Sequence, residues 1–171
     1  MKKLFTLLAL TSALLANAQE ESNYVNGAIT IGVVVEDMEN SLKFYTEVLN
    51  FKEAGGFDID SAFGSYSGLS NGVPFKVTIL KTSDTPEASQ WKLVSFNKSA
   101  QHPEQQFIQD DTGMQYMTLY VKNLDPIIKN IQKAGIPFLN KPNTRIRDGR
   151  GFILIQDPDG IFIELIGPMT K

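Results

Sequence analysis

The sequence contains no cysteine and only one histidine, His102, among its 171 residues. Without cysteine there is no disulfide framework, iron–sulfur cluster, structural zinc knot or thiol nucleophile. One histidine limits any histidine-rich metal site to a single imidazole per chain. Hydrophobic residues make up 42% and charged residues 20% of the chain, which excludes wholesale disorder and fibrous repeats. The formal net charge of −3 argues against a nucleic-acid partner, because that partner would require a basic face.

Residues 1–18 have the pattern of a secretory signal peptide. Lys2 and Lys3 precede an apolar run from Leu4 to Leu15, and Ala16-Asn17-Ala18 is a small-residue cleavage site. The apolar run is too short for a transmembrane helix, which needs about 20 apolar residues. We therefore expect cleavage after Ala18, export to the periplasm or the extracellular medium, and no membrane association of the mature chain.

The remaining residues, 19–171, suffice for one ordinary domain, and its two halves follow the same plan. In the first half we predict a helix capped by Asp37 and strands over 27–35, 56–60, 62–68 and 74–81. In the second half we predict a helix that starts at Asp125 and ends before Gly135. Its strands are predicted over 115–121, 137–140, 144–147, 152–156 and 161–166.

A constant shift of 86 residues relates the halves. Val35–Glu39 aligns with Val121–Asp125, and Phe75–Leu80 aligns with Ile161–Ile166. Two matches at one offset indicate a duplicated βαβββ unit. One unit cannot cover both faces of its sheet, so we expect the two units to pair and to leave a concave surface between them. Residues 82–114 would then be an insert, with one further strand over 90–96, and a connection of that length is usually functional.

Two segments resemble the vicinal oxygen chelate superfamily, which includes glyoxalase I, bleomycin-resistance proteins, fosfomycin-resistance enzymes and extradiol dioxygenases. The first, IGVVVEDMENSLKFYTEVLNF, has the strand–Asp–helix–Phe-Tyr-x-x-x-Leu pattern, and the second, FILIQDPDGIFIEL, has the Asp-Pro-x-Gly turn followed by x-x-Glu-Leu. The resemblance covers about residues 28–81 and 114–167. It implies an α+β fold in which tandem βαβββ modules pair into an open, cupped β-sheet with helices on the outer face. It also implies homodimers, in which the modules pair within or between chains.

Metal-dependent members of that superfamily place one ligand on the first and last strand of each half. The resemblance assigns these four positions to Thr30, Thr78, Tyr116 and Glu164. Only Glu164 is a usual ligand, since two threonines and a tyrosine are poor donors for Zn²⁺, Fe²⁺ or Mn²⁺. We therefore expect no metal at this place and no other cofactor.

Strand alternation places more side chains beside these four. The expected ligand-binding residues are Thr30, Lys76, Thr78, Tyr116, Thr118, Tyr120, Phe162 and Glu164. Aromatic and aliphatic groups with a few hydroxyls suit a small, partly apolar ligand. Glu164 is the candidate catalytic residue, because a carboxylate facing such a cavity can act as a general acid or base. The alternative is that Glu164 belongs to a structural hydrogen-bond network.

The sequence leaves three possible functions open. The first is an exported, metal-free protein that binds a small molecule and acts on it weakly, if at all, through Glu164. The second is a glyoxalase-like lyase or isomerase, or a dioxygenase, with an atypical metal site. The third is a non-catalytic domain that binds a protein partner through residues 82–114. Arg145, Arg147 and Arg150 form either an anion clamp or a solvated turn, while His102 and Trp91 have no assigned role.

Overall fold

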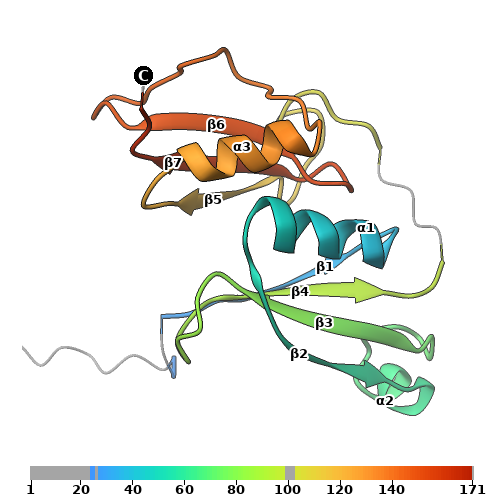
Figure 1. Cartoon of the computed structure of the whole chain (residues 1–171). Helices are drawn as coiled ribbons and strands as arrows, with labels where there is room; N and C mark the ends of the chain where they lie inside the picture. The colour runs from blue at the N-terminus through green and yellow to red at the C-terminus, as the bar shows by residue number, and fades with distance from the viewer. Residues whose placement is uncertain (1–23, 26, 99–102, 171) are drawn as a thin grey trace, which may run out of the picture.

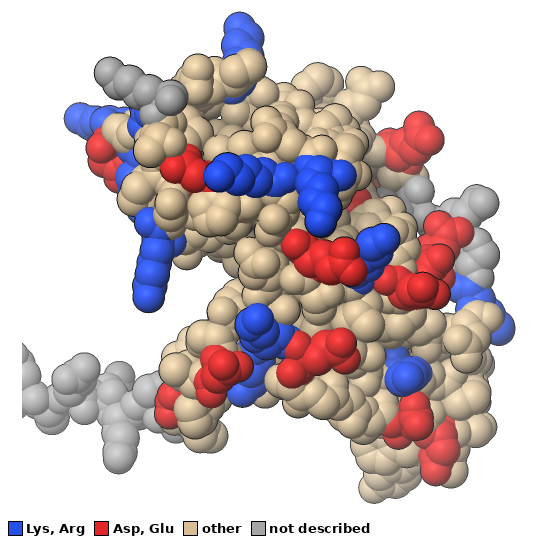
Figure 2. Space-filling view, viewed as in Figure 1, with Lys and Arg blue, Asp and Glu red and all other residues tan. Residues whose placement is uncertain are grey.

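The computed structural model describes residues 24–25, 27–98 and 103–170, which form two consecutive modules (Figure 1). The expected signal peptide and His102 lie outside the described residues. Within the described part of the chain, no helix is long and apolar enough to cross a membrane. Acidic and basic side chains are intermingled over the face shown in Figure 2, which carries no extended basic patch.

Module one is a four-stranded sheet with a helix packed on one face. Its elements are β1 (Thr30–Val34), α1 (Met38–Lys43), the π-helical turn η1 (Phe44–Val48), β2 (Lys52–Ile59), α2 (Ser61–Tyr66), β3 (Phe75–Lys81) and β4 (Gln90–Ser95). The strand order is β1-β4-β3-β2. β1 is parallel to β4, and β3 is antiparallel to both of its neighbours.

Module two repeats this plan with one strand fewer. Its elements are β5 (Tyr116–Tyr120), α3 (Asp125–Lys133), β6 (Gly151–Gln156) and β7 (Phe162–Gly167). The strand order is β5-β7-β6, with β5 parallel and β6 antiparallel to β7. The prediction of tandem α+β modules with open sheets is confirmed.

The predicted helix boundaries are close to those observed. The Asp37 side chain accepts a hydrogen bond from the backbone N–H of Asn40 at 3.0 Å and so caps α1. α3 begins at Asp125, and Gly135 follows it with a φ of 70°, a left-handed conformation that glycine adopts without strain.

Several strand predictions are wrong. Residues 62–68 do not form a strand, because Asp60 accepts from the Phe63 N–H at 2.7 Å and starts helix α2 instead. Residues 137–140 form no strand, and of 144–147 only Arg145 makes an isolated bridge, to Gly151. The predicted strand over 90–96 is present as β4, but it belongs to module one and not to an insert.

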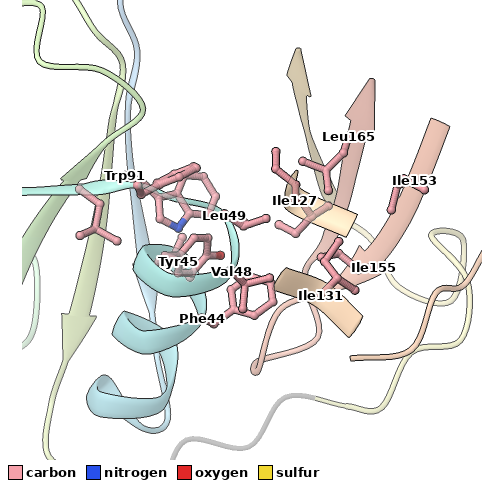
Figure 3. Packing of buried hydrophobic residues seen from close by; sticks show 14 of the residues in the cluster. Phe44, Tyr45, Val48, Leu49, Trp91, Ile127, Ile131, Ile153, Ile155 and Leu165 are labelled. Carbon is pink, nitrogen blue, oxygen red and sulfur yellow. The ribbon is translucent and has the colours of Figure 1, made fainter. Parts of the chain in front are cut away.

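The two helices lie between the two sheets. Figure 3 shows Phe44, Val48 and Leu49 of the first helical segment facing Ile127 and Ile131 of α3. These side chains belong to one buried cluster, which also takes in Trp91, Leu93, Ile163 and Leu165 from the sheets. The Asn130 side chain donates to the Val48 carbonyl at 3.2 Å across the contact. Each sheet therefore turns its other face, which we call its outer face, away from the opposite module.

A turn of module two holds the start of the first helix. Asp159 accepts hydrogen bonds from the Glu36 N–H at 2.9 Å and from the Ser41 hydroxyl at 3.0 Å. Asp157 accepts from the Tyr45 hydroxyl at 2.7 Å. Burial raises the pKa of Asp157, although the Tyr45 hydrogen bond opposes this shift. Burial, together with the neighbouring Asp157 carboxylate, also raises the pKa of Tyr45 far above its ordinary value, so the phenol remains a donor.

Candidate ligand-binding site

The parallel strand pairs define which residues of the two modules are equivalent. In module one, Thr30 pairs with Gln90 and Gly32 pairs with Lys92. In module two, Tyr116 pairs with Phe162 and Thr118 pairs with Glu164. The 86-residue shift therefore holds from β1 to β5, so Thr30 and Tyr116 are equivalent as predicted. The last strands, β4 and β7, are instead related by 72 residues, which makes Lys92 the counterpart of Glu164.

The predicted equivalence of Thr78 and Glu164 is consequently wrong. Thr78 lies on β3, where it pairs with Leu93, and Leu80 pairs with Trp91. Opposed residues of antiparallel strands share a face, and Leu80, Leu93 and Trp91 are in the buried cluster against the helix. Thr78 thus faces the helix layer. By alternation Lys76 is on that same face, and it is exposed near the end of the strand.

The outer face of module two brings together five of the predicted residues. Strand alternation and the register put Tyr116, Thr118, Tyr120, Phe162 and Glu164 on that face. The Thr118 hydroxyl donates to Glu164 Oε2 at 2.6 Å, a length typical of a charge-assisted hydrogen bond. No hydrogen bond within the described residues uses the other oxygen, Oε1. The half-buried carboxylate is therefore held in place with one acceptor left for a ligand.

Aromatic side chains flank this carboxylate. Tyr116 is 47% and Tyr120 is 71% exposed, and the Arg150 guanidinium lies over the Tyr120 ring, 5.4 Å from its centroid. Phe162 shares the face but is almost fully buried. Gln156, which pairs with Phe162 across β6 and β7, donates to the Gln105 carbonyl at 3.0 Å. Gln105, in the segment between β4 and β5, therefore lies against that end of the sheet.

The three arginines do not act as one clamp. Arg150 forms an ion pair with Asp148 at 2.7 Å, and this contact lowers the pKa of Asp148. Arg145 donates to the carbonyls of Gly149 and Met169. Arg145 is thus engaged in holding its own loop, and Arg150 is the one of the three with a ring contact to the outer face among the described residues.

The outer face of module one carries a residue that sequence reasoning missed. Lys92 is half-buried, and its ammonium lies 5.5 Å from the centre of the Phe57 ring, within reach of a cation–π interaction. Its neighbour on β1 is Gly32, where an added Cβ would meet only Val94 Cγ2 at 3.9 Å. The sequence held a signal for Lys92, because Trp91-Lys92-Leu93-Val94 has the same pattern as Ile163-Glu164-Leu165-Ile166.

These side chains do not fit a divalent cation. On the first and last strands of the two modules, the positions that hold metal ligands in metal-dependent members of the superfamily are occupied here by Thr30, Lys92, Tyr116 and Glu164. An ammonium has no lone pair to donate, and it repels a cation, so the corrected set is a poorer metal site than the predicted one. Among the described residues, no group of three or more histidine, cysteine, aspartate and glutamate side chains could hold a metal ion.

A concavity lies between the helices and contains none of the predicted site residues. It has a volume of about 630 Å³, and Lys43, Phe44, Lys133 and Asp157 are part of its lining. Asp157 is the acid of this lining whose pKa is raised by burial. The Asp157 oxygens, however, accept hydrogen bonds from Tyr45 and from the backbone N–H groups of Asp159 and Ile161. That carboxylate is committed to the fold, so we place the candidate site on the outer faces.

Comparison with known proteins identifies the family. The sequence profile of the Glyoxalase/Bleomycin resistance protein/Dioxygenase superfamily matches residues 27–165. A glyoxalase family protein from Bacillus cereus is similar in structure, with a TM-score of 0.69 and 17% identity, covering 90% of this chain and 100% of its own. The trypanothione-dependent glyoxalase I of Leishmania major has a TM-score of 0.58 and 18% identity, covering 81% of this chain and 84% of its own. At these identities the structural likeness shows the fold alone, but with the profile match it establishes that the chain belongs to the Glyoxalase/Bleomycin resistance protein/Dioxygenase superfamily.

Proposed function

We propose that this chain is an exported, homodimeric protein that binds a small, partly apolar molecule on the outer face of module two without a divalent metal. The observation that carries the proposal is Glu164, which is held by Thr118 through Oε2 and keeps Oε1 for a ligand. Tyr116 and Tyr120 offer ring surface on either side of it. A bound molecule that presents a hydroxyl or amine donor to Oε1 and an apolar body to the rings satisfies both features. Glu164 then also acts as a weak general base toward that donor.

The test compares the purified protein with three variants. Tyr116→Ala removes ring surface, and Glu164→Gln removes the charge while its amide oxygen still accepts from Thr118. Tyr66→Ala is the matched control, since Tyr66 is an exposed tyrosine on α2 of module one. Native mass spectrometry reveals any co-purifying molecule. A thermal-shift titration with phenol, which combines one ring with one donor, supplies a defined probe.

The expected result is binding in the unaltered protein and in Tyr66→Ala, with binding weakened at least tenfold in the other two variants. Ligand at about 100 times its Kd stabilises the folded state by about 2.7 kcal/mol, an amount readily seen in the melting temperature. Elemental analysis is run in parallel. A fourth variant, Glu164→Ala, is made for this measurement. Stoichiometric zinc, nickel, manganese or iron that is lost in Glu164→Ala would refute the metal-free proposal and favour a metal-dependent lyase, isomerase or dioxygenase.

A further inference from the structure

The concavity between the helices, which we call the helix groove, has no part in the proposed function. Its volume of about 630 Å³ lies within the range of small-molecule pockets, which is about 300–1,000 Å³. One wall belongs to α1 and η1, and the other belongs to α3 and the chain that follows it. Both modules therefore form the groove, and a molecule bound there would contact both of them.

Apolar side chains from both walls line the helix groove. Phe44 and Val48 come from η1, whereas Ile136, Pro137 and Leu139 come from the chain after α3. Phe44 and Val48 are buried, but Leu139 is 42% exposed. A large aliphatic side chain left open in the lining of a hollow is surface that an apolar ligand would remove from water.

The two walls differ in charge. On the first wall, Lys43 and Glu47 lie four residues apart and offset each other. On the second wall, Lys133 is the one charged residue among the described lining residues, and it is exposed. Neither Lys133 nor Lys43 belongs to an ion pair within the described part of the chain. Figure 2, in the orientation of Figure 1, shows basic side chains over α3 and side chains of both signs over α1.

We propose that the helix groove is a second binding site, which takes a small monocarboxylate whose other end is an apolar chain or ring. The Lys133 ammonium pairs with the carboxylate, and the apolar end covers Ile136 and Leu139. A monoanion fits because Lys133 lacks an acid on its own wall, while Asp157 of the lining is occupied by hydrogen bonds from Tyr45 and the backbone. This site is separate from Glu164 and goes beyond the proposed function.

Two probes that differ in one group test the charge. Hydrocinnamate has a carboxylate and a ring, and hydrocinnamyl alcohol has the same carbon skeleton without the charge. Isothermal titration calorimetry should give a Kd of about 1 mM or below for hydrocinnamate, in line with the affinity per atom of small ligands. The alcohol should bind about fivefold more weakly, because it cannot form the ion pair. In isotope-labelled protein, hydrocinnamate should shift the amide signals of residues 130–139 and leave those of 116–120 unchanged.

Three variants test the location of the site. Lys133→Gln removes the charge, and Ala134→Phe fills the groove from the C-terminal end of α3. Lys129→Gln is the matched control, since Lys129 is an exposed lysine of the same helix outside the lining. Hydrocinnamate binding should weaken about fivefold in Lys133→Gln and stay within about twofold in Lys129→Gln, and it should be lost in Ala134→Phe. Circular dichroism confirms that each variant is folded.

Four results would overturn the inference. They are no saturable binding of hydrocinnamate up to about 20 mM, equal affinities for hydrocinnamate and the alcohol, equal affinities of Lys133→Gln and Lys129→Gln, and signal changes confined to residues 116–120.

The phenol titration of the proposed function gives a separate result. Glu164→Gln and Tyr116→Ala should bind hydrocinnamate as the unaltered protein does, because neither residue lines the helix groove. Failure of hydrocinnamate binding alone therefore contradicts only the groove site, whereas failure of phenol binding alone contradicts only the proposed function.

Discussion

Replacing Tyr45 with phenylalanine should destabilise the chain most at neutral pH. The Tyr45 hydroxyl is fully buried and donates to Asp157 Oδ2 at 2.7 Å. A hydrogen bond to a charged acceptor contributes about 1.5–3 kcal/mol, against about 0.5–1.5 kcal/mol for a neutral one. We expect a loss of about 2 kcal/mol in the free energy of unfolding when the Asp157 carboxyl is ionised, and about half of that when it is protonated.

The sign of the pH dependence follows from the direction of the shift. Burial raises the pKa of Asp157 above its ordinary value of 3.8, so the folded chain binds this proton more tightly than the unfolded chain does. This group therefore favours folding at low pH and opposes it as the pH rises through the raised pKa. Removing the Tyr45 hydroxyl raises the pKa of Asp157 further, which makes the variant lose stability more steeply with rising pH.

Urea unfolding between pH 4 and pH 8 provides the measurement. Trp91, the only tryptophan, is buried with its ring centre 5.8 Å from that of Tyr45, so its fluorescence reports on unfolding at this site. Far-UV circular dichroism provides an independent signal. Tyr66→Phe, at a position that is 91% exposed, should change nothing. An equal loss at pH 4 and pH 8, or a loss below about 0.5 kcal/mol throughout, would refute this account of the pair.

Two further predictions concern the backbone. Asp60→Ala removes the acceptor for the Phe63 N–H and should cost about 1 kcal/mol, seen as a lower urea midpoint; no change would mean that α2 does not depend on its cap. Gly167→Ala would bring a Cβ into collision with the Val121 carbonyl oxygen and should cost more than about 2 kcal/mol. Gly32→Ala has room for its methyl group and should be nearly neutral, and equal losses in the two glycine variants would contradict the packing described.

Local signals in the sequence were sufficient for the first helix, for α3 and for the turn after β6. Asp37 caps the first helix, Gly135 ends α3, and the Gly160 N–H donates to the Asp157 carbonyl to close the predicted turn. Each of these features depends on groups within four residues of one another. The same kind of signal was overlooked at Asp60, where residues 62–68 were predicted to form a strand although a capping aspartate precedes them.

Strand partners could not be read in the same way. Phe75–Leu80 and Ile161–Ile166 are both apolar stretches of similar length, and their 86-residue match arose from that composition. Which strand lies parallel to β1 depends on contacts between distant residues, and these select β4. The error moved the expected site of module one onto the helix-facing side of β3.

The residues predicted to share one face do so in one sheet only. Within module two, alternation along β5 and β7 was enough to bring Thr118 and Glu164 into contact. In module one the same reasoning started from the wrong strand and passed over Lys92, which interrupts the apolar pattern of β4. A charged side chain in the middle of an otherwise apolar strand was the clue.

The turn that carries Asp157 and Asp159 also determines how this chain can be divided. Both carboxylates belong to the second half, yet they bind Glu36, Ser41 and Tyr45 of the first half. The halves are thus docked by side chains as well as joined by the segment between β4 and β5. Two polypeptides cut between residues 103 and 114 would retain the docking groups on both sides, which makes the protein suited to fragment complementation at that point.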